Sequence, residues 1–166
     1  MTILKIDSSI TGDNSVSRQL TQAVAGQLLK ASPQAPVIQR DLVATPLSHL
    51  TLGGSGDQDV LEEFLAADTI VIGAPMYNFT VPSQLKAWID RILVAGTTFR
   101  YGANGPEGLA GGKRVIVAVS RGGFYDEANA LEHPLRKLSK LFVPVALVEP
   151  DTGQKLRRLR LPSRRV

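Results

Sequence analysis

Hydrophobic and polar residues recur along the chain in two patterns. Short apolar runs rich in β-branched side chains are typical of strands buried on both faces of a parallel sheet. Longer stretches with an apolar residue every three or four positions are typical of amphipathic helices. Strand and helix patterns alternate, which predicts an α/β protein with a parallel sheet between two helical layers. The predicted strands are residues 2–7, 37–42, 69–73 and 113–119, and the predicted helices are residues 18–30, 57–67 and 82–95, with Gly96 ending the last helix.

The loop after the first predicted strand is dense in hydroxyl side chains. Residues 8–17 read SSITGDNSVS, and Ser15 or Ser17 is a suitable N-cap for the helix that follows. The free N–H groups and the positive dipole end of a helix start attract anions, so we expect this loop to bind a phosphate. It has neither the glycine spacing of a dinucleotide fingerprint nor the Gly-Lys-Ser/Thr of a P-loop. A single phosphate is therefore expected, rather than a pyrophosphate or a transferable γ-phosphate.

The third predicted strand runs into an aromatic loop. Residues 69–88 read TIVIGAPMYNFTVPSQLKAW, which places Met76, Tyr77, Asn78 and Phe79 between a strand and a helix. Open α/β sheets bind ligands at the carboxyl ends of their strands. The alternative is that the two aromatic side chains only cover the end of the sheet.

Two later segments have related features. The fourth predicted strand ends in SRGGFY, where Gly122 and Gly123 either let backbone N–H groups approach a ligand or only make a tight turn. Residues 97–109 form a connection long enough to indicate a function. Within it, Phe99 and Tyr101 either line a planar pocket or belong to a short β-hairpin that covers the sheet.

The three strand ends together predict a mononucleotide site. A phosphate site, a flat wall and backbone donors meet at one edge of the sheet, and flavin mononucleotide (FMN) fits this combination best. The chain offers no evident acid–base pair, nucleophile or metal cage, so we expect no catalytic side chain and no metal. Chemistry carried by a bound cofactor is consistent with this.

Composition narrows the class of protein further. The 166 residues predict one domain, and 43% hydrophobic residues are ordinary for a globular protein. The absence of cysteine excludes disulfides, a thiol nucleophile and thiolate metal sites, and the two histidines are not spaced as a metal pair. No apolar run approaches the length of a membrane span and the start does not resemble a signal peptide, so a soluble, cytoplasmic protein is expected.

Charge is distributed unevenly along the chain. The formal charge is +7 over residues 136–166 and −3 over residues 1–135, which together give the net charge of +4. A basic end can bind nucleic acid or acidic lipid. No nucleic-acid motif accompanies it, so we expect neither a nucleic-acid nor a membrane partner.

The loop motifs resemble those of a known family. The chain is similar to the FMN-dependent NADH azoreductases, also called FMN-dependent NADH:quinone oxidoreductases, which have the flavodoxin-like fold. The MYNF, NGPEGL and SRGG segments carry most of the specificity. The shared segments occur in order between residue 1 and about residue 133, at residues 8–9, 15–17, 74–79, 84–86, 98–101, 104–109 and 120–123.

This resemblance implies a fold, a reaction and an assembly. The fold would be a flavodoxin-like doubly wound sheet with the strand order 2-1-3-4-5. The family transfers a hydride from NADH to bound FMN and then passes two electrons to a quinone or an azo compound in a ping-pong cycle. Its members are homodimers in which the partner subunit completes the substrate pocket.

The resemblance also implies roles for individual residues. Ser9, Ser15, Val16 and Ser17 would hold the FMN phosphate. Met76, Tyr77, Asn78 and Phe79 would contact the ring and the ribityl chain, and Ser120, Arg121, Gly122 and Gly123 would bind the pyrimidine edge of the flavin. The substrate pocket would include Phe99, Tyr101 and Phe124.

The chain departs from the family in two places. The loop before Asp57 is shorter than in the family, which leaves substrate preference open. After His133 the family pattern is not recognisable, although the apolar run at residues 141–148 is suited to a fifth strand in spite of Pro144. We expect an FMN-binding domain over residues 1–149, a basic disordered tail over residues 150–166, and reduced stability because the last family helix is missing. Two alternatives remain: an FMN-binding electron carrier without turnover of its own, and an inactive product of the altered C-terminus.

Overall fold

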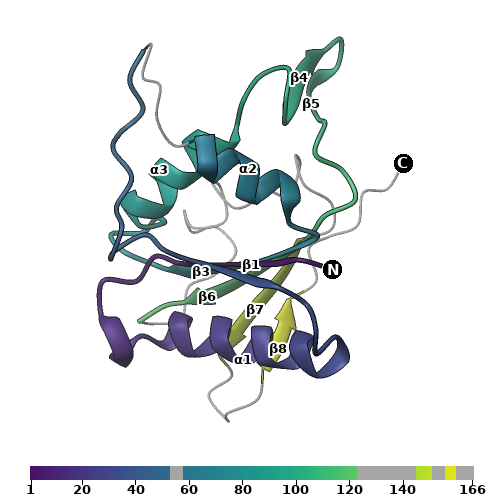
Figure 1. Ribbon diagram of the computed structural model, residues 1–166. Helices are drawn as coiled ribbons and strands as arrows, with labels where there is room; N and C mark the ends of the chain where they lie inside the picture. Colours follow the sequence, from purple (N-terminus) through teal and green to yellow (C-terminus); the bar gives the residue numbers. More distant parts are fainter. Residues whose placement is uncertain (53–57, 123–144, 151–155, 160–166) are drawn as a thin grey trace.

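A computed structural model describes residues 1–52, 58–122, 145–150 and 156–159 of the chain (Figure 1). One six-stranded sheet has the order β2-β1-β3-β6-β7-β8. The first five strands in this order are parallel, which confirms the predicted order 2-1-3-4-5. The fifth strand, expected within residues 141–148, is found at residues 145–150, and residues 141–144 lie outside the described part of the chain. The strands are β1 (Ile3–Asp7), β2 (Val37–Asp41), β3 (Thr69–Pro75), β6 (Arg114–Ser120), β7 (Val145–Pro150) and β8 (Leu156–Leu159).

Helices cover both faces of this sheet. Helix α1 (Val16–Ala31) packs along one face, against β1, β3 and β6. Helices α2 (Gln58–Ala66) and α3 (Ser83–Ile92) lie together on the opposite face (Figure 1). The predicted three-layer α/β/α arrangement is therefore confirmed.

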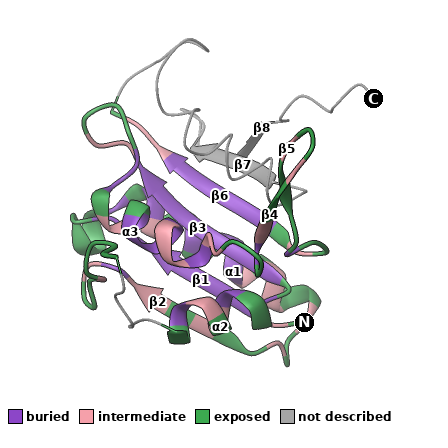
Figure 2. Cartoon of the chain, turned by 90° about the horizontal axis from the view of Figure 1, so that it is seen from above, coloured by how far each residue is buried: buried purple, intermediate pink, exposed green. Residues whose placement is uncertain are grey.

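The central strands are almost entirely buried (Figure 2). The larger part of the core lies between the sheet and α2 and α3, where Phe64 and Trp88 pack edge to face with ring centroids 6.2 Å apart. A smaller apolar cluster lies under α1 and includes Ile3 and Val24. Burial on both faces explains why these strands read as continuous apolar runs in the sequence.

A buried polar cluster interrupts the core under α1. Although β1 has an apolar pattern, Lys5 and Asp7 are both buried, and their Nζ and Oδ2 atoms lie 2.6 Å apart. The Thr21 hydroxyl of α1 donates to Asp7 Oδ1 at 2.7 Å. A Cβ atom added to Gly73 on β3 would lie 3.1 Å from Thr21 Cγ2 and 3.4 Å from Asp7 Oδ1, so glycine leaves room for this cluster.

The structure corrects the predicted end of the third helix. Helix α3 ends at Ile92, and Gly96 lies beyond it in the following turn. The buried hydroxyl of Thr98 takes over the capping, because it donates to the Ile92 carbonyl at 2.6 Å and accepts from Val94 N–H at 2.9 Å. The helix therefore ends at Ile92, four residues before the predicted Gly96, and its last carbonyl is capped by the side chain of Thr98.

Two more segments differ from or refine the sequence interpretation. The long connection after α3 contains the hairpin of β4 (Phe99–Gly102) and β5 (Gly105–Gly108), which was one of its two interpretations. Strand β8, which pairs antiparallel with β7, was not predicted and falls in the tail expected to be disordered.

No helix in the described part of the chain has the length and the apolar run needed to cross a membrane.

Candidate functional site

The three candidate loops meet at one edge of the sheet. Strands β1, β3 and β6 are parallel neighbours, so their carboxyl ends point the same way. The Ser9 hydroxyl oxygen lies 3.0 Å from the Tyr77 hydroxyl oxygen, which joins the first loop to the second. The Met76 N–H donates to the Ser120 carbonyl at 2.8 Å, which joins the second loop to the third. The predicted convergence of the loops is confirmed.

The hydroxyl-rich loop surrounds the start of α1. Ser15 is the N-cap, since its Oγ accepts a hydrogen bond from Arg18 N–H at 3.2 Å, and it lies 3.1 Å from Ser17 Oγ. Ser9, Ser15 and Ser17 are buried, whereas Val16 is exposed. The first N–H groups of this 16-residue helix have no acceptor within the helix. Hydroxyls and free amides around a positive dipole end fit a phosphate group.

The aromatic loop contains a tight turn with an unusual backbone. Tyr77 and Thr80 exchange two backbone hydrogen bonds, each of 3.0 Å. Between them Asn78 has φ 48° and Phe79 has φ 64°, the left-handed region that favours glycine. A left-handed asparagine is fairly common, but a left-handed phenylalanine is strained. Such strain persists where the surroundings enforce it, which is frequent at ligand sites.

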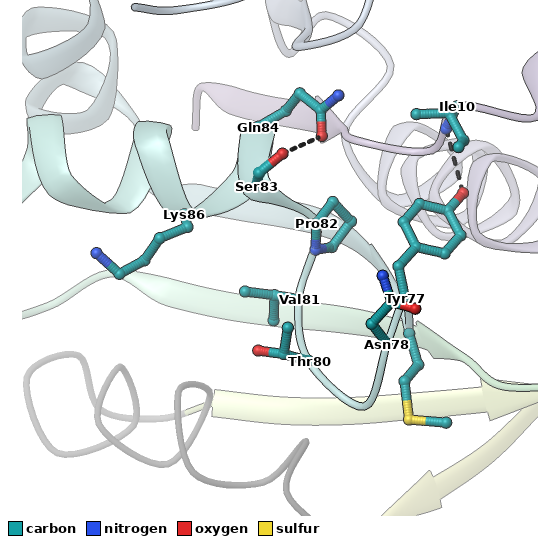
Figure 3. A pocket seen from close by; sticks show the side chains of 10 residues that line it. Ile10, Tyr77, Asn78, Thr80, Val81, Pro82, Ser83, Gln84 and Lys86 are labelled. Carbon is teal, nitrogen blue, oxygen red and sulfur yellow. Dashed lines mark hydrogen bonds between the residues drawn. The ribbon is translucent and has the colours of Figure 1, made fainter. Parts of the chain in front are cut away.

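A pocket of about 770 Å³ opens beside this turn (Figure 3). It lies between the first loop, the aromatic loop and the start of α3. Lys86 carries the only charge among the described lining residues. The lining residues are Ile10, Met76, Tyr77, Asn78, Thr80, Val81, Pro82, Ser83, Gln84 and Lys86.

The pocket contains part of the predicted aromatic set and extends beyond it. Met76, Tyr77 and Asn78 line it, whereas Phe79 is 59% exposed and is not among the lining residues. Sequence reasoning missed Ile10 and six residues that follow the aromatic loop: Thr80, Val81, Pro82, Ser83, Gln84 and Lys86. Their signal was available, because Ile10 lies in the serine-rich loop and the first turn of α3 follows the aromatic loop directly.

The third loop is described only in part. Ser120 and Arg121 are half-buried and Gly122 is exposed, whereas Gly123 and Phe124 lie outside the described residues. A Cβ atom added to Gly122 would meet no atom of the described residues within 4 Å. Packing within the described part of the chain therefore does not require glycine at this position.

The hairpin aromatics lie apart from this pocket. Phe99 and Tyr101 contact each other edge to face, with ring centroids 5.4 Å apart. Tyr101 is 79% exposed, and neither ring lines the pocket. Phe99 and Tyr101, which were predicted to belong to the substrate pocket, therefore do not line the pocket beside the aromatic loop of the same chain.

An ion pair that the sequence interpretation overlooked supports the first loop. Arg18 Nη1 and Nη2 donate to Asp41 Oδ2 and Oδ1 at 2.6 Å and 2.8 Å. Hydrogen bonds from Arg18 lower the pKa of Asp41 to about 2, so this carboxylate is charged at neutral pH. Arg18 also donates to the Ser9 carbonyl from Nη2 at 3.0 Å.

These features define a class of protein. An open parallel sheet, a hydroxyl-lined helix start and an adjoining pocket at the same edge are the features of an α/β protein that binds a phosphorylated ligand at its strand ends. Buried hydroxyls at the loop after β1 fit a phosphate, and the pocket beside Tyr77 and Met76 is suited to a flat ring. The described residues therefore fit a mononucleotide such as FMN.

Comparison with known proteins agrees with this class. A family model described as the flavodoxin-like fold matches residues 1–143. The chain is 52% identical to "FMN-dependent NADH:quinone oxidoreductase 2" of Bradyrhizobium diazoefficiens over 171 residues, covering 91% of this chain and 85% of the relative. It is 54% identical to "FMN-dependent NADH:quinone oxidoreductase 1" of Xanthomonas axonopodis pv. citri over 144 residues, covering 81% of this chain and 75% of the relative. The chain belongs to the flavodoxin-like family that contains these FMN-dependent NADH:quinone oxidoreductases.

Solved structures with the same fold include azoreductases. Azoreductase AzrA matches with a TM-score of 0.75 and 25% identity, covering 90% of this chain and 87% of that one. An FMN-dependent NADH-azoreductase from Bacillus anthracis, solved with FMN, also matches with a TM-score of 0.75 at 21% identity, covering 93% of this chain and 89% of that one. The match to the family model continues past residue 133, where the sequence resemblance was expected to end.

Proposed function

We propose that this protein is an FMN-dependent oxidoreductase. It oxidises NADH and reduces quinones by two electrons, and it cleaves azo compounds reductively. The main support is that the hydroxyl-lined start of α1 and the pocket lie side by side at the ends of β1 and β3. The 3.0 Å contact between the Ser9 and Tyr77 hydroxyls joins these two parts of the site. The match to oxidoreductases at 52% and 54% identity supports the same reaction.

The protein's own residues bind and orient the cofactor in this proposal. The hydroxyls of Ser9, Ser15 and Ser17 hold its phosphate, and Met76 to Phe79 contact its ring and ribityl chain. When bound, FMN supplies the redox chemistry. The described lining of the pocket holds one amine, Lys86, and no carboxylate, so the side chains there serve binding and orientation.

The third loop and the assembly complete the proposal. Ser120, Arg121 and Gly122 bind the pyrimidine edge of the flavin, together with Gly123 outside the described residues. The protein acts as a homodimer in the cytoplasm, and the hairpin of β4 and β5 contributes Phe99 and Tyr101 to the substrate pocket of the pair. The large exposed area of Tyr101 supports this role, because a ring that is 79% exposed on one chain is free to contact another.

Reconstitution with FMN tests the proposal. The full chain is purified, incubated with excess FMN, desalted, and examined for visible flavin absorbance. NADH is then added under anaerobic conditions, followed by menadione or an azo dye. We expect retained flavin, bleaching by NADH, and return of the flavin spectrum with the acceptor.

Other outcomes separate the competing functions. Flavin that is retained but not bleached by NADH identifies an electron carrier, and a colourless protein refutes FMN binding altogether. Sedimentation of the same sample distinguishes a colourless monomer, expected of an inactive product, from a dimer.

A further inference from the structure

The geometry points to Arg18 as a positioning residue for the phosphate of the cofactor. This inference rests on the proposed function, because it concerns how the loop after β1 is held ready for FMN. Arg18 belongs to α1, but its side chain reaches back over the loop. It donates to the Ser9 carbonyl from Nε at 3.3 Å and from Nη2 at 3.0 Å.

The guanidinium group is itself fixed from the other side. Asp41 at the end of β2 receives two hydrogen bonds from Arg18, at 2.6 Å and 2.8 Å. The Asp41 carboxylate also accepts hydrogen bonds from Val43 N–H at 2.9 Å and Ala44 N–H at 3.3 Å. A planar guanidinium held by a bidentate carboxylate has little rotational freedom, so the Ser9 carbonyl meets a rigid donor.

Holding this carbonyl fixes the groups that face the ligand. The Ser9 hydroxyl lies on the same residue, 3.0 Å from Thr11 Oγ1 and 3.0 Å from the Tyr77 hydroxyl. The Ser15 hydroxyl accepts from the backbone N–H of Arg18, so the same residue also anchors the N-cap. Arg18 thus connects the loop after β1, the end of β2 and the start of α1.

Arg18 acts through Ser9 and not as a direct ligand. Its side chain is 18% exposed, and the described donors of the guanidinium point to Asp41 and to the Ser9 carbonyl. Its charge is balanced by Asp41 at close range. The expected effect of Arg18 is therefore on the geometry of the phosphate loop, which FMN requires and riboflavin does not.

The test compares FMN with riboflavin, which has the same ring and ribityl chain but no phosphate. Dissociation constants of both flavins are measured by fluorescence titration for the wild type and for Arg18→Gln. We expect the ratio of riboflavin to FMN dissociation constants to fall about tenfold or more in Arg18→Gln, from the loss of hydrogen bonds made by a charged group. Arg18→Lys keeps the charge without the planar fork, and we expect it to restore only part of the ratio.

Arg40 provides a matched control. It also makes a double ion pair, to Asp59 at 2.6 Å and Glu63 at 2.8 Å, but these carboxylates belong to α2 on the other face. Arg40→Gln should lower the melting temperature about as much as Arg18→Gln and leave the flavin ratio unchanged. If Arg18→Gln fails to fold, Asp41→Asn removes the charge of the partner instead and should lower the ratio as well.

The outcomes distinguish this inference from the proposed function. A ratio in Arg18→Gln equal to that of the wild type overturns the positioning role, as does an equal fall in Arg40→Gln. A wild type that binds riboflavin as tightly as FMN also overturns the positioning role, but it remains consistent with a flavin-dependent oxidoreductase. A wild type that binds neither flavin overturns the inference and the proposed function together.

Discussion

Replacing Tyr77 with phenylalanine removes a link between two of the candidate loops while keeping the ring. The Tyr77 hydroxyl accepts a hydrogen bond from Ile10 N–H at 3.2 Å and shares one of 3.0 Å with Ser9 Oγ. Each hydrogen bond of this kind contributes about 1 kcal/mol net. If the loops must be joined to bind FMN, the loss of both costs roughly 1–2 kcal/mol of binding, or about 5- to 30-fold in the dissociation constant.

FMN titration of the apoprotein, followed by flavin fluorescence, measures this loss. Tyr101→Phe is a suitable control, because it makes the same chemical change on the exposed hairpin outside the pocket. We expect Tyr101→Phe to leave the dissociation constant unchanged. An unchanged constant for Tyr77→Phe would refute the idea that contact between the loops prepares the site.

Three further predictions follow from individual contacts. Asn78→Ala should weaken FMN retention after desalting, whereas Asn78→Gly should lose the same contact with little change in the melting temperature, since asparagine and glycine both adopt φ 48° readily. Lys113→Met removes a cation that donates to two carbonyl groups at the end of α2 at 2.7 Å and 2.8 Å, and should cost about 1–3 kcal/mol in urea unfolding. Hydrogen bonds from Arg18 lower the pKa of Asp41 from 3.8 to about 2. The charged Asp41 therefore contributes about 1–2 kcal/mol, after solvent screening, to the free energy of unfolding above pH 4, and this contribution is lost as the pH falls toward 2. Asp41→Asn should therefore flatten the loss of stability in an acid titration over that range.

Most of the fold could be predicted because its signals are local. Apolar runs mark β1, β3 and β6 directly, since strands buried on both faces have little room for polar residues. The end of α3 was missed for the opposite reason, because the capping hydroxyl of Thr98 comes from beyond the helix. Strand β8 was missed because Leu156–Leu159 is short and half basic, and only its pairing with β7 makes it a strand.

The site was predicted at the level of loops and less well at the level of side chains. Strand order alone places three loops at one edge, and hydroxyl and aromatic residues in those loops stand out in the sequence. The pocket also uses Ile10 and Lys86, whose residue types carry no signal and whose place beside the serine-rich and aromatic loops is the only indication in the sequence. Phe79 shows the converse, because its place in the motif predicts contact with the ligand while its side chain is 59% exposed in the single chain.

The supports of the site explain why some of its residues could not be found by motif. The atoms that would face a phosphate are hydroxyls and amides, which are weak ligands unless they are held in place. What holds them is a second set of contacts: Arg18 on the Ser9 carbonyl, the Ser8 hydroxyl on the Gly73 carbonyl at 2.6 Å, and the Thr21 hydroxyl on Asp7. Arg18 and Thr21 lie on α1 and Ser8 lies directly after β1. No motif marks Arg18 and Thr21 in the sequence, because the common feature of these residues is the loop that they hold.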